Sequence, residues 1–384
     1  MANTLTEAIP YITSRTLAVL REQSIMPRLV NNSFSTDAQE QGDTINIPVT
    51  NAQTTRVVTP GQTHPTSGLN DVVPTKKTIT LNQWHESAFV MTDKELKEIV
   101  DGFQPRVLDE AVRAIANKVD SDILSLYQQV YQHVGTAGNS PFQNSFLEAQ
   151  EASRVLSSAK APMQERYVVV DPYAHANLLG LPVLQRVDQS GSNEVLRDGV
   201  AQGTRALGFD WYTDQNTPTH DTNASGTYAI DAIGAVGDTT IVVDDGAGAA
   251  PTSLVVGDKL TIAGSTQQYT VTAVAAGTPS VNEDTYTISP ALDQVIADGD
   301  AVTVVATDYV ANMAFHRDAI GFASRPLLDV NPDDGGIIQS ISDPVSGLSL
   351  RLEVQRLYKQ TQFSIDILYG YTLVRPELAC VIFG

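Results

Sequence analysis

The chain is predicted to have an α+β fold with a separate all-β domain inserted into it. Three features of its 384 residues carry this prediction. They are one long amphipathic helix, long strands with apolar–polar alternation, and an abrupt change of composition between residues 222 and 307. The α/β pattern continues on both sides of that segment, which marks it as an insertion rather than a terminal domain. We therefore expect a main body of helices packed on sheets and one small β-barrel-like domain.

The N-terminal part of the chain predicts an arm followed by a long hairpin. Residues 1–41 carry only a short helical pattern, whereas two alternating runs flank a polar stretch rich in Pro and Gly over residues 42–91. The first run contains Ile45, Ile47 and Val49, and the second is KKTITLNQWHESAFVM. Because a connection of this length is unusual inside a compact domain, we expect the hairpin to project and contact another subunit. The alternative is a surface loop without a partner.

A long helix is predicted to begin at Pro105 and to run without interruption to Val134, about 45 Å at 1.5 Å per residue. Its apolar residues recur at steps of three and four and form one stripe, which predicts that the helix lies on a sheet. Four-residue steps outnumber three-residue steps, and this argues against a coiled coil. The core positions of this spine helix are Leu108, Val112, Ile115, Val119, Ile123, Leu126 and Val130.

The rest of the chain divides into an α/β part, the inserted domain and a final pair of strands. Asp171 and Pro172 predict the capped start of a helix after the strand RYVVV. The segment 222–307 is predicted to form short strands separated by turns, and it contains ten acidic residues and a single basic one, Lys259. In the last forty residues, strict alternation predicts a long antiparallel pair whose apolar face supports the long helix.

Composition excludes several classes of protein. The formal net charge of −20 repels polyanions and makes sequence-specific binding of nucleic acid improbable. The single cysteine, Cys380, has apolar neighbours and indicates an ordinary buried thiol. No export signal or membrane span is recognisable, so we expect a protein that is neither exported nor inserted in a membrane.

Motifs for catalysis and metal binding are weak. His316-Arg317-Asp318 matches the tripeptide of the protein-kinase catalytic loop, but Ala323 stands where a kinase needs its metal-binding asparagine. We interpret this region as a half-buried strand with the triplet at its solvated end. The six histidines are scattered without zinc-ligand spacing, and Asp244-Asp245 lacks the ligand pattern of an EF-hand. The sequence therefore predicts no enzyme and no cofactor.

Six segments occur in an order that resembles the major capsid proteins of tailed phages, and more specifically the podovirus-type coat proteins with an inserted β-domain. This capsid fold is shared with encapsulins and herpesvirus shells. The segments are GDTINIPV, TLNQWHESAFVMTDKEL, ALGFDWYTDQN, GDKLTIAG, NMAFHRDAIGFA and GLSLRLEVQRLY.

The resemblance implies a shell protein that self-assembles through pentamers and hexamers around the double-stranded DNA of a tailed phage, without sequence-specific contact to that DNA. Partners would be a scaffolding protein and a portal during assembly in the host cytoplasm, and possible decoration proteins on the mature virion capsid. In these terms the domains are an N-terminal arm (1–41), an extended loop (42–91), a peripheral domain (92–141 and 337–375), an axial domain (142–221, 308–336 and 376–384) and the insertion (222–307).

The resemblance also indicates where subunits would touch. Candidate assembly residues on the extended loop are Arg56, His64, Lys76 and Lys77. Some capsids of this fold join a loop lysine covalently to an asparagine of a neighbour. Because the loop between Thr50 and Thr75 contains no lysine and arginine cannot replace one, we expect a shell without such links.

Two alternatives remain. An encapsulin-type nanocompartment shares the fold, although a large inserted β-domain is untypical of it. A bacterial surface adhesin would need an export signal.

Overall fold

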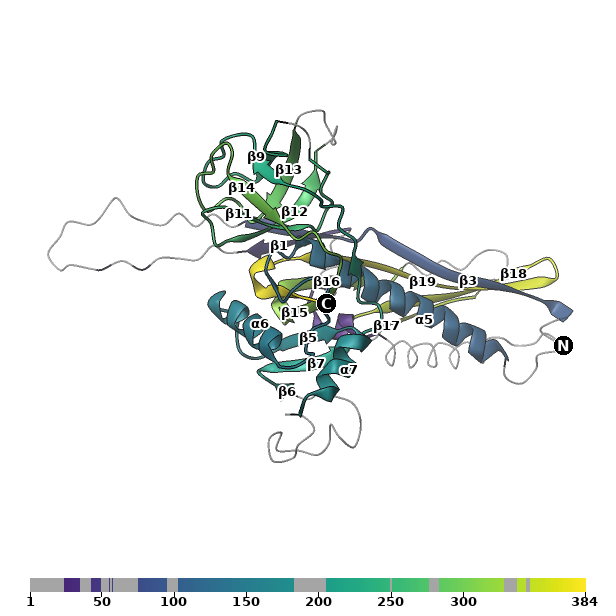
Figure 1. Ribbon diagram of the computed structural model, residues 1–384. Helices are drawn as coiled ribbons and strands as arrows, with labels where there is room; N and C mark the ends of the chain where they lie inside the picture. The colour runs from purple at the N-terminus through teal and green to yellow at the C-terminus, as the bar shows by residue number, and fades with distance from the viewer. Residues whose placement is uncertain are drawn as a thin grey trace.

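A computed structural model describes residues 24–34, 43–49, 55, 57, 75–94, 103–182, 205–248, 251–275, 283–327, 337–342 and 346–384. It confirms the α+β class and contains a closed β-barrel. Figure 1 shows the barrel at the top, a mixed sheet with two helices at the bottom, and one long helix lying along long strands that extend to the right. None of the helices in the described residues is long and apolar enough to cross a membrane.

The long strands form an antiparallel five-stranded sheet in the order β16-β19-β18-β17, with β3 also paired to β19. The predicted strand pair of the last forty residues is confirmed as β18 and β19, which pair from Leu350↔Ile367 to Leu357↔Gln360. The strands are β3 (Gln83–Thr92), β16 (Ile320–Arg325), β17 (Ile337–Ser342), β18 (Ser349–Leu357) and β19 (Gln360–Leu373).

One face of this sheet is apolar and lies beneath the long helix α5 (Phe103–Leu124). Alternation places Leu352, Val354 and Ile365 on that face, and all three are buried in one core cluster with the apolar stripe of the helix. The hydroxyl of Tyr369 on β19 donates a hydrogen bond of 2.5 Å to Asp122 on α5. The expectation that the helix lies on the terminal strands is thus confirmed.

The predicted length of the helix is wrong. It ends at Leu124, and a 3-10 turn η2 (Ser125–Gln129) and a short strand β4 (His133–Val134) follow. Backbone carbonyls of η2 accept hydrogen bonds from the barrel, including one from Thr270 to Gln128, and β4 pairs in parallel with β20 (Ala379–Phe383). The apolar period continued past the α-helix because Leu126, in the 3-10 turn, and Val130, just after it, are buried in the same core.

A second, mixed sheet has the order β4-β20-β15-β5-β7-β6, with β8 also paired to β15. Helix α6 (Leu147–Ser158) packs against β20, and helix α7 (Pro172–Gly180) is capped as predicted, because Asp171 accepts hydrogen bonds from the backbone of Tyr173 and Ala174. The remaining strands of this sheet are β5 (Arg166–Val170), β6 (Arg205–Ala206), β7 (Phe209–Thr213), β8 (Thr219–His220) and β15 (Tyr309–His316).

The barrel closes in the order β10-β13-β12-β11-β14-β9 and has its own apolar core. Its strands fall inside the segment 222–307, and the chain enters and leaves it through two paired strands, because Tyr309 of β15 lies opposite His220 of β8. The strands are β9 (Tyr228–Ile230), β10 (Thr240–Asp244), β11 (Lys259–Ile262), β12 (Gln268–Val274), β13 (Asp284–Ser289) and β14 (Ala301–Val304).

The hairpin arm differs from its prediction in one respect. Strands β1 (Thr44–Val49) and β2 (Thr75–Thr80) pair over their whole length. The second alternating run does not continue along the arm, because Gln83–Thr92 forms β3 and pairs with β19 instead. Similarly, Ile320–Arg325, which we assigned to the axial domain, joins the five-stranded sheet as β16. Alternation alone identifies a strand but not the sheet in which it finds its partner.

Candidate functional site

The base of the β1–β2 arm sits on the five-stranded sheet through a small apolar cluster. Ile45, Ile47 and Ile79 alternate with exposed residues along the two strands and are buried. They pack with Leu81 and with Leu368 of β19 in a cluster separate from the main core. This cluster therefore holds β1 and β2 against the five-stranded sheet.

Two glycines of the five-stranded sheet allow β1 and β2 to lie this close to it, and we call this contact the arm seat. A Cβ atom added to Gly370 on β19 would lie 2.3 Å from the carbonyl oxygen of Thr80, at the end of β2. One added to Gly321 on β16 would lie 3.1 Å from Ile79 Cδ1. The backbone of the arm thus crosses the sheet where two side chains are missing, and larger residues there would lift it.

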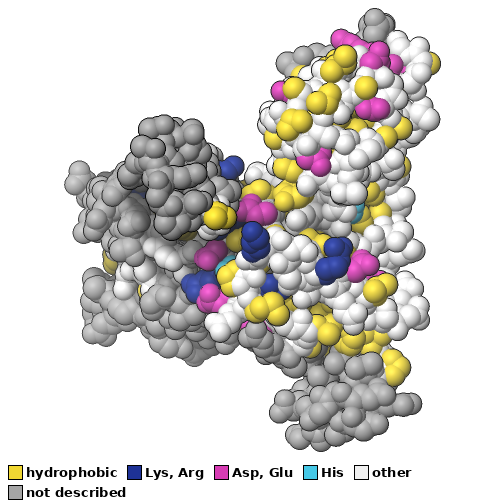
Figure 2. All heavy atoms as spheres, turned by 90° about the vertical axis from the view of Figure 1, so that its left-hand side faces the viewer, with side chains coloured by type: hydrophobic (Ala, Val, Ile, Leu, Met, Phe, Trp, Pro, Cys, Tyr) yellow, Lys and Arg dark blue, Asp and Glu magenta, His cyan; other side chains and the backbone are white. Residues whose placement is uncertain are grey.

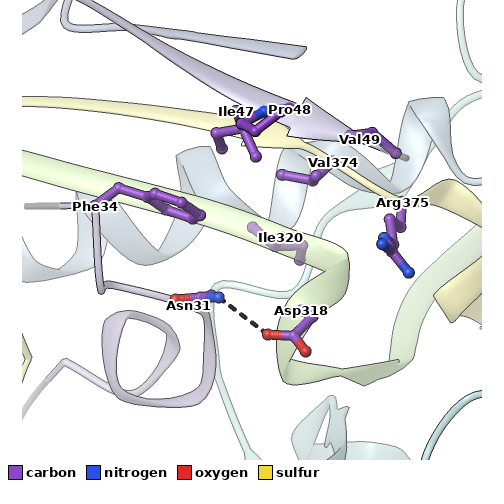
Figure 3. Close-up of a pocket in the computed structure, with 9 residues that line it drawn as sticks. All are labelled: Asn31, Phe34, Ile47, Pro48, Val49, Asp318, Ile320, Val374 and Arg375. Atoms are coloured by element: carbon purple, nitrogen blue, oxygen red, sulfur yellow. Dashed lines mark hydrogen bonds between the residues drawn. The ribbon is translucent and has the colours of Figure 1, made fainter. Parts of the chain in front are cut away.

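A pocket of about 180 Å³ opens beside this seat. Phe34, Ile47 and Ile320 contribute apolar walls, and Asp318 and Arg375 contribute charge (Figure 3). The Asn31 amide donates a hydrogen bond of 3.0 Å to Asp318 across one side of the pocket. The pocket lies where the N-terminal segment, the arm and the sheet meet.

The N-terminal segment is fixed to the spine helix. Asp120 of α5 accepts hydrogen bonds of 3.1 Å from the backbone N–H groups of Ile25 and Met26, which begin the short helix α2 (Met26–Leu29). Burial and the neighbouring Asp214 raise the pKa of Asp120 well above its usual value, while the two backbone donors act in the opposite direction. The segment continues to Asn31, which forms a parallel bridge with Gly321.

The other face of the five-stranded sheet is exposed along β3. Trp84, Glu86 and Val90 are exposed there, and the Trp84 indole donates a hydrogen bond of 3.0 Å to Asp366. Asp366 also accepts a charged hydrogen bond of 2.6 Å from Arg351 on β18. An exposed tryptophan held at a fixed angle is the type of side chain that protein interfaces favour.

A buried polar joint attaches the barrel to the main body. The Lys259 ammonium is fully buried and donates hydrogen bonds to the carbonyls of Tyr127 (3.0 Å) and Val130 (2.5 Å) and to the hydroxyl of Thr270 (3.0 Å). Burial lowers the pKa of Lys259 to about 7, although the nearby Asp258 favours the charged form. Such a joint holds the barrel in one orientation, because each group left without its partner would carry a desolvation cost.

Histidines complete the joint. His220 contacts the Tyr127 hydroxyl at 2.9 Å through Nδ1 and Asp258 at 2.8 Å through Nε2. The backbone N–H of His133 donates to the Gln268 side chain at 2.9 Å. Burial and the charge of Lys259 lower the pKa of His133 to about 4.

Most of the predicted core residues of the spine helix are buried. Val112, Ile115, Val119 and Ile123 are buried on α5, whereas Leu126 and Val130 are buried beyond its end. The side chain of Leu108 lies outside the described part. That breaking this stripe prevents the formation of normal shells stays a prediction.

Two of the four candidate assembly residues lie in the described part of the chain. Arg56 and His64 lie outside the described residues. Lys76 and Lys77 are exposed on β2, opposite Pro48 and Ile47 of β1.

The interpretation of the His316-Arg317-Asp318 triplet needs correction. His316 is buried, and the strand β15 before it is buried almost throughout rather than half-buried. Arg317 and Asp318 form a 3-10 turn that carries the chain from the mixed sheet into β16 of the five-stranded sheet. The Arg317 guanidinium donates to Glu165 at 3.2 Å, and the Asp318 carboxylate accepts the Asn31 bond. These contacts are structural.

Sequence reasoning missed a repeated turn in the barrel that was visible in the sequence. The segments Ala235–Asp238, Val255–Asp258 and Ala297–Asp300 share the pattern Ala/Val-x-Gly-Asp, and each precedes a strand. In each turn the aspartate side chain accepts a hydrogen bond of 2.7–2.8 Å from the backbone N–H three residues earlier. The glycine adopts a positive φ of 88–104° in all three, which a side chain would strain.

Side chains for metal binding are not gathered in the described part of the chain, where no group of three or more His, Cys, Asp or Glu residues could hold an ion. Burial raises the pKa of Cys380 to about 12, so this thiol stays protonated at neutral pH.

The chain is similar to known proteins in its sequence family and in its fold. Residues 75–257 match the family described as phage capsid protein. A solved chain from Mycobacterium phage Che8 has the same fold, with 15% identity, coverage of 94% of this chain and 91% of that chain, and a TM-score of 0.53.

Two further structures are more distant. The capsid structure of the Cyanophage P-SCSP1u has 12% identity, coverage of 94% and 88%, and a TM-score of 0.47. The mature capsid of bacteriophage PhiM1 has 14% identity, coverage of 90% and 83%, and a TM-score of 0.46. No curated protein sequence matches the chain.

Proposed function

We propose that this chain, which belongs to the phage capsid proteins, is the major capsid protein whose copies assemble into the icosahedral shell of a tailed phage. The family match and the shared fold support this role. The structural observation that supports it best is the β1–β2 arm, which packs on the five-stranded sheet through Ile45, Ile47 and Ile79 in a small cluster separate from the main core.

The arm suits contact between subunits. An isolated two-stranded hairpin is marginally stable in water, so a hairpin such as β1–β2 gains stability when a further surface covers it. The open face of β3, with exposed Trp84 and Val90, offers such a surface on a neighbouring copy. We propose that the extended loop of one subunit overlaps the peripheral domain of the next.

The spine helix and the five-stranded sheet form the rigid part of the subunit. Their shared core and the bond from Tyr369 to Asp122 resist bending. Rigid subunits joined by many small contacts build a stable shell, because repetition multiplies weak interfaces. In this proposal the chain has a structural role, with no catalytic one.

The finer features of the proposal follow the family. Pentamers and hexamers of the chain would assemble with a scaffolding protein and a portal in the host cytoplasm, and decoration proteins are possible partners. The net charge of −20 suits a shell that encloses DNA without binding it specifically.

Expression of the chain alone and with the scaffolding protein of its phage tests the proposal. Electron microscopy and light scattering should show closed shells in at least one condition. The variant Ile79→Asp places a charge in the arm seat and should leave unassembled subunits, whereas Thr240→Asp, at an exposed barrel position, should assemble normally. Compact monomers in both conditions would contradict the proposal, as would normal shells from Ile79→Asp.

A further inference from the structure

The barrel has two different ends. Strand β11 is antiparallel to β14, β14 to β9, and β9 to β10. Consequently β10 and β14 start at one end of the barrel and β11 starts at the other. The Val255–Asp258 turn, which precedes β11, packs against the main body, because a Cβ on Gly257 would lie 3.0 Å from both Gln128 and His220. The turns at Ala235–Asp238 and Ala297–Asp300 therefore lie at the opposite end of the barrel from the Val255–Asp258 turn, and we call that end the free end.

The free end presents exposed aliphatic side chains on a preformed surface. Ile233 is 76%, Val236 62% and Val295 64% exposed. Their two loops are held together by backbone hydrogen bonds between Gly234 and Ile296 and from Gly237 to Leu292. A Cβ on Gly234 would lie 2.9 Å from Leu292 and Ile296, so the two loops are closely packed. Exposed aliphatic residues on rigid, paired loops are typical of a docking surface.

The charge around these aliphatic residues has one sign. Asp238, Asp293 and Asp298 are exposed on the same two loops. Lys259 is the only lysine or arginine between residues 222 and 307, and it is buried in the joint. Figure 2 shows hydrophobic and acidic side chains on the visible face of the barrel, at the top, and no basic ones.

The Val255–Asp258 turn, which packs against the main body, shows what such a turn can bind. Asp258 uses one carboxylate oxygen to close its own turn and the other to accept hydrogen bonds from His220 and Thr222. In the free turns, Asp238 and Asp300 close their turns in the same way, through Oδ2. Their Oδ1 atoms have the chemistry to accept a bond from a cationic side chain of a partner.

We propose that the free end of the barrel is the attachment surface for a second protein, whose contact face carries lysine or arginine around aliphatic side chains. This inference rests on the proposed function, because it places the surface on a shell subunit. Another copy of the barrel is a poor occupant, since its free end carries the same negative charges and like charges repel across an interface.

Carbodiimide cross-linking of purified virions tests the proposal, because the reagent joins carboxylates directly to lysines. Digestion and mass spectrometry should find Asp238, Asp293 or Asp298 joined to lysines of a second virion protein. Links from these residues only to lysines of the coat protein, or no links at all, would overturn the inference.

Variants provide the second test. The double variant Ile233→Ser with Val295→Ser should still form shells and melt at the wild-type temperature, but should retain less than a tenth of the second protein. Met163→Ser, which changes an apolar residue 61% exposed on the main body, is the matched control and should retain it fully. Shells of the double variant with wild-type amounts of that protein would refute the attachment surface, whereas the absence of shells from the wild type would instead refute the proposed function.

Discussion

Replacement of Gly370 by alanine should lift the arm from its seat. The added Cβ would lie 2.3 Å from the Thr80 carbonyl oxygen and 2.8 Å from its carbonyl carbon. Neither atom can rotate away, because both belong to the backbone of β2, which is paired with β1 at Thr44↔Thr80. An ordinary contact needs a separation of 3.4 Å or more. The end of β2 must therefore move by about 1 Å.

The expected cost follows from this shift. Overpacking of a well-packed contact costs about 1–3 kcal/mol. The shift also loosens Ile45, Ile47 and Ile79 from the cluster that holds the arm. We expect the variant to unfold with a free energy about 1–3 kcal/mol lower than the wild type and to assemble poorly, because the arm no longer projects at the same angle.

Chemical denaturation, electron microscopy and amide exchange measure these effects. Exchange should accelerate in β1 and β2 and stay unchanged in α7. The control Gly180→Ala adds a methyl group at a glycine of α7 that has no atom within 4 Å, so it should keep or slightly raise stability. If Gly370→Ala had the stability, amide exchange and assembly of the wild type, the proposed close contact between Gly370 and Thr80 would be refuted.

Four further predictions concern the core, the joint and covalent links between subunits. Ile123→Asp buries an unpaired charge on the spine stripe and should destabilise by about 4 kcal/mol or more in denaturant titrations, abolishing shells. Lys259→Met leaves buried carbonyls without donors and should cost about 1–3 kcal/mol, with faster amide exchange in η2; unchanged exchange would refute the role of the joint. The pKa of His133 is about 4 in the folded protein, below its value in the unfolded chain. Between these two pKa values the unfolded state binds more protons, so the free energy of unfolding falls as the pH drops through that range. In the His133→Gln variant this pH-dependent part of the free energy of unfolding, about 3 kcal/mol at most, should be absent. If the stabilities of the wild type and the variant changed in parallel with pH, the lowered pKa of His133 would not be the cause. Boiled, reduced virions should give one coat band near 41.2 kDa, and multimers linked through Lys76 or Lys77 would show that the shell is covalently joined.

The repeating patterns of the sequence identified the elements whose burial is local and periodic. The stripe of α5, the alternation of β18 and β19 and the Asp171 cap were all confirmed, because period and capping chemistry depend on near neighbours in the chain. The break in composition likewise indicated the all-β insertion, within which the barrel strands fall.

Only the tertiary structure decided where each element found its partner. The helix stopped at Leu124 because barrel side chains and β20 supply hydrogen bonds to the following residues, and no periodicity reports such distant donors. The run from Lys76 to Met91 split between the arm and the β19 sheet for the same reason, since an alternating strand pairs equally well with either until the fold brings one of them close. The contact at Gly370 and the buried amine of Lys259 depend on groups more than a hundred residues away in the chain. The sequence by itself therefore determined the parts of this protein, and three-dimensional contact decided how they are joined.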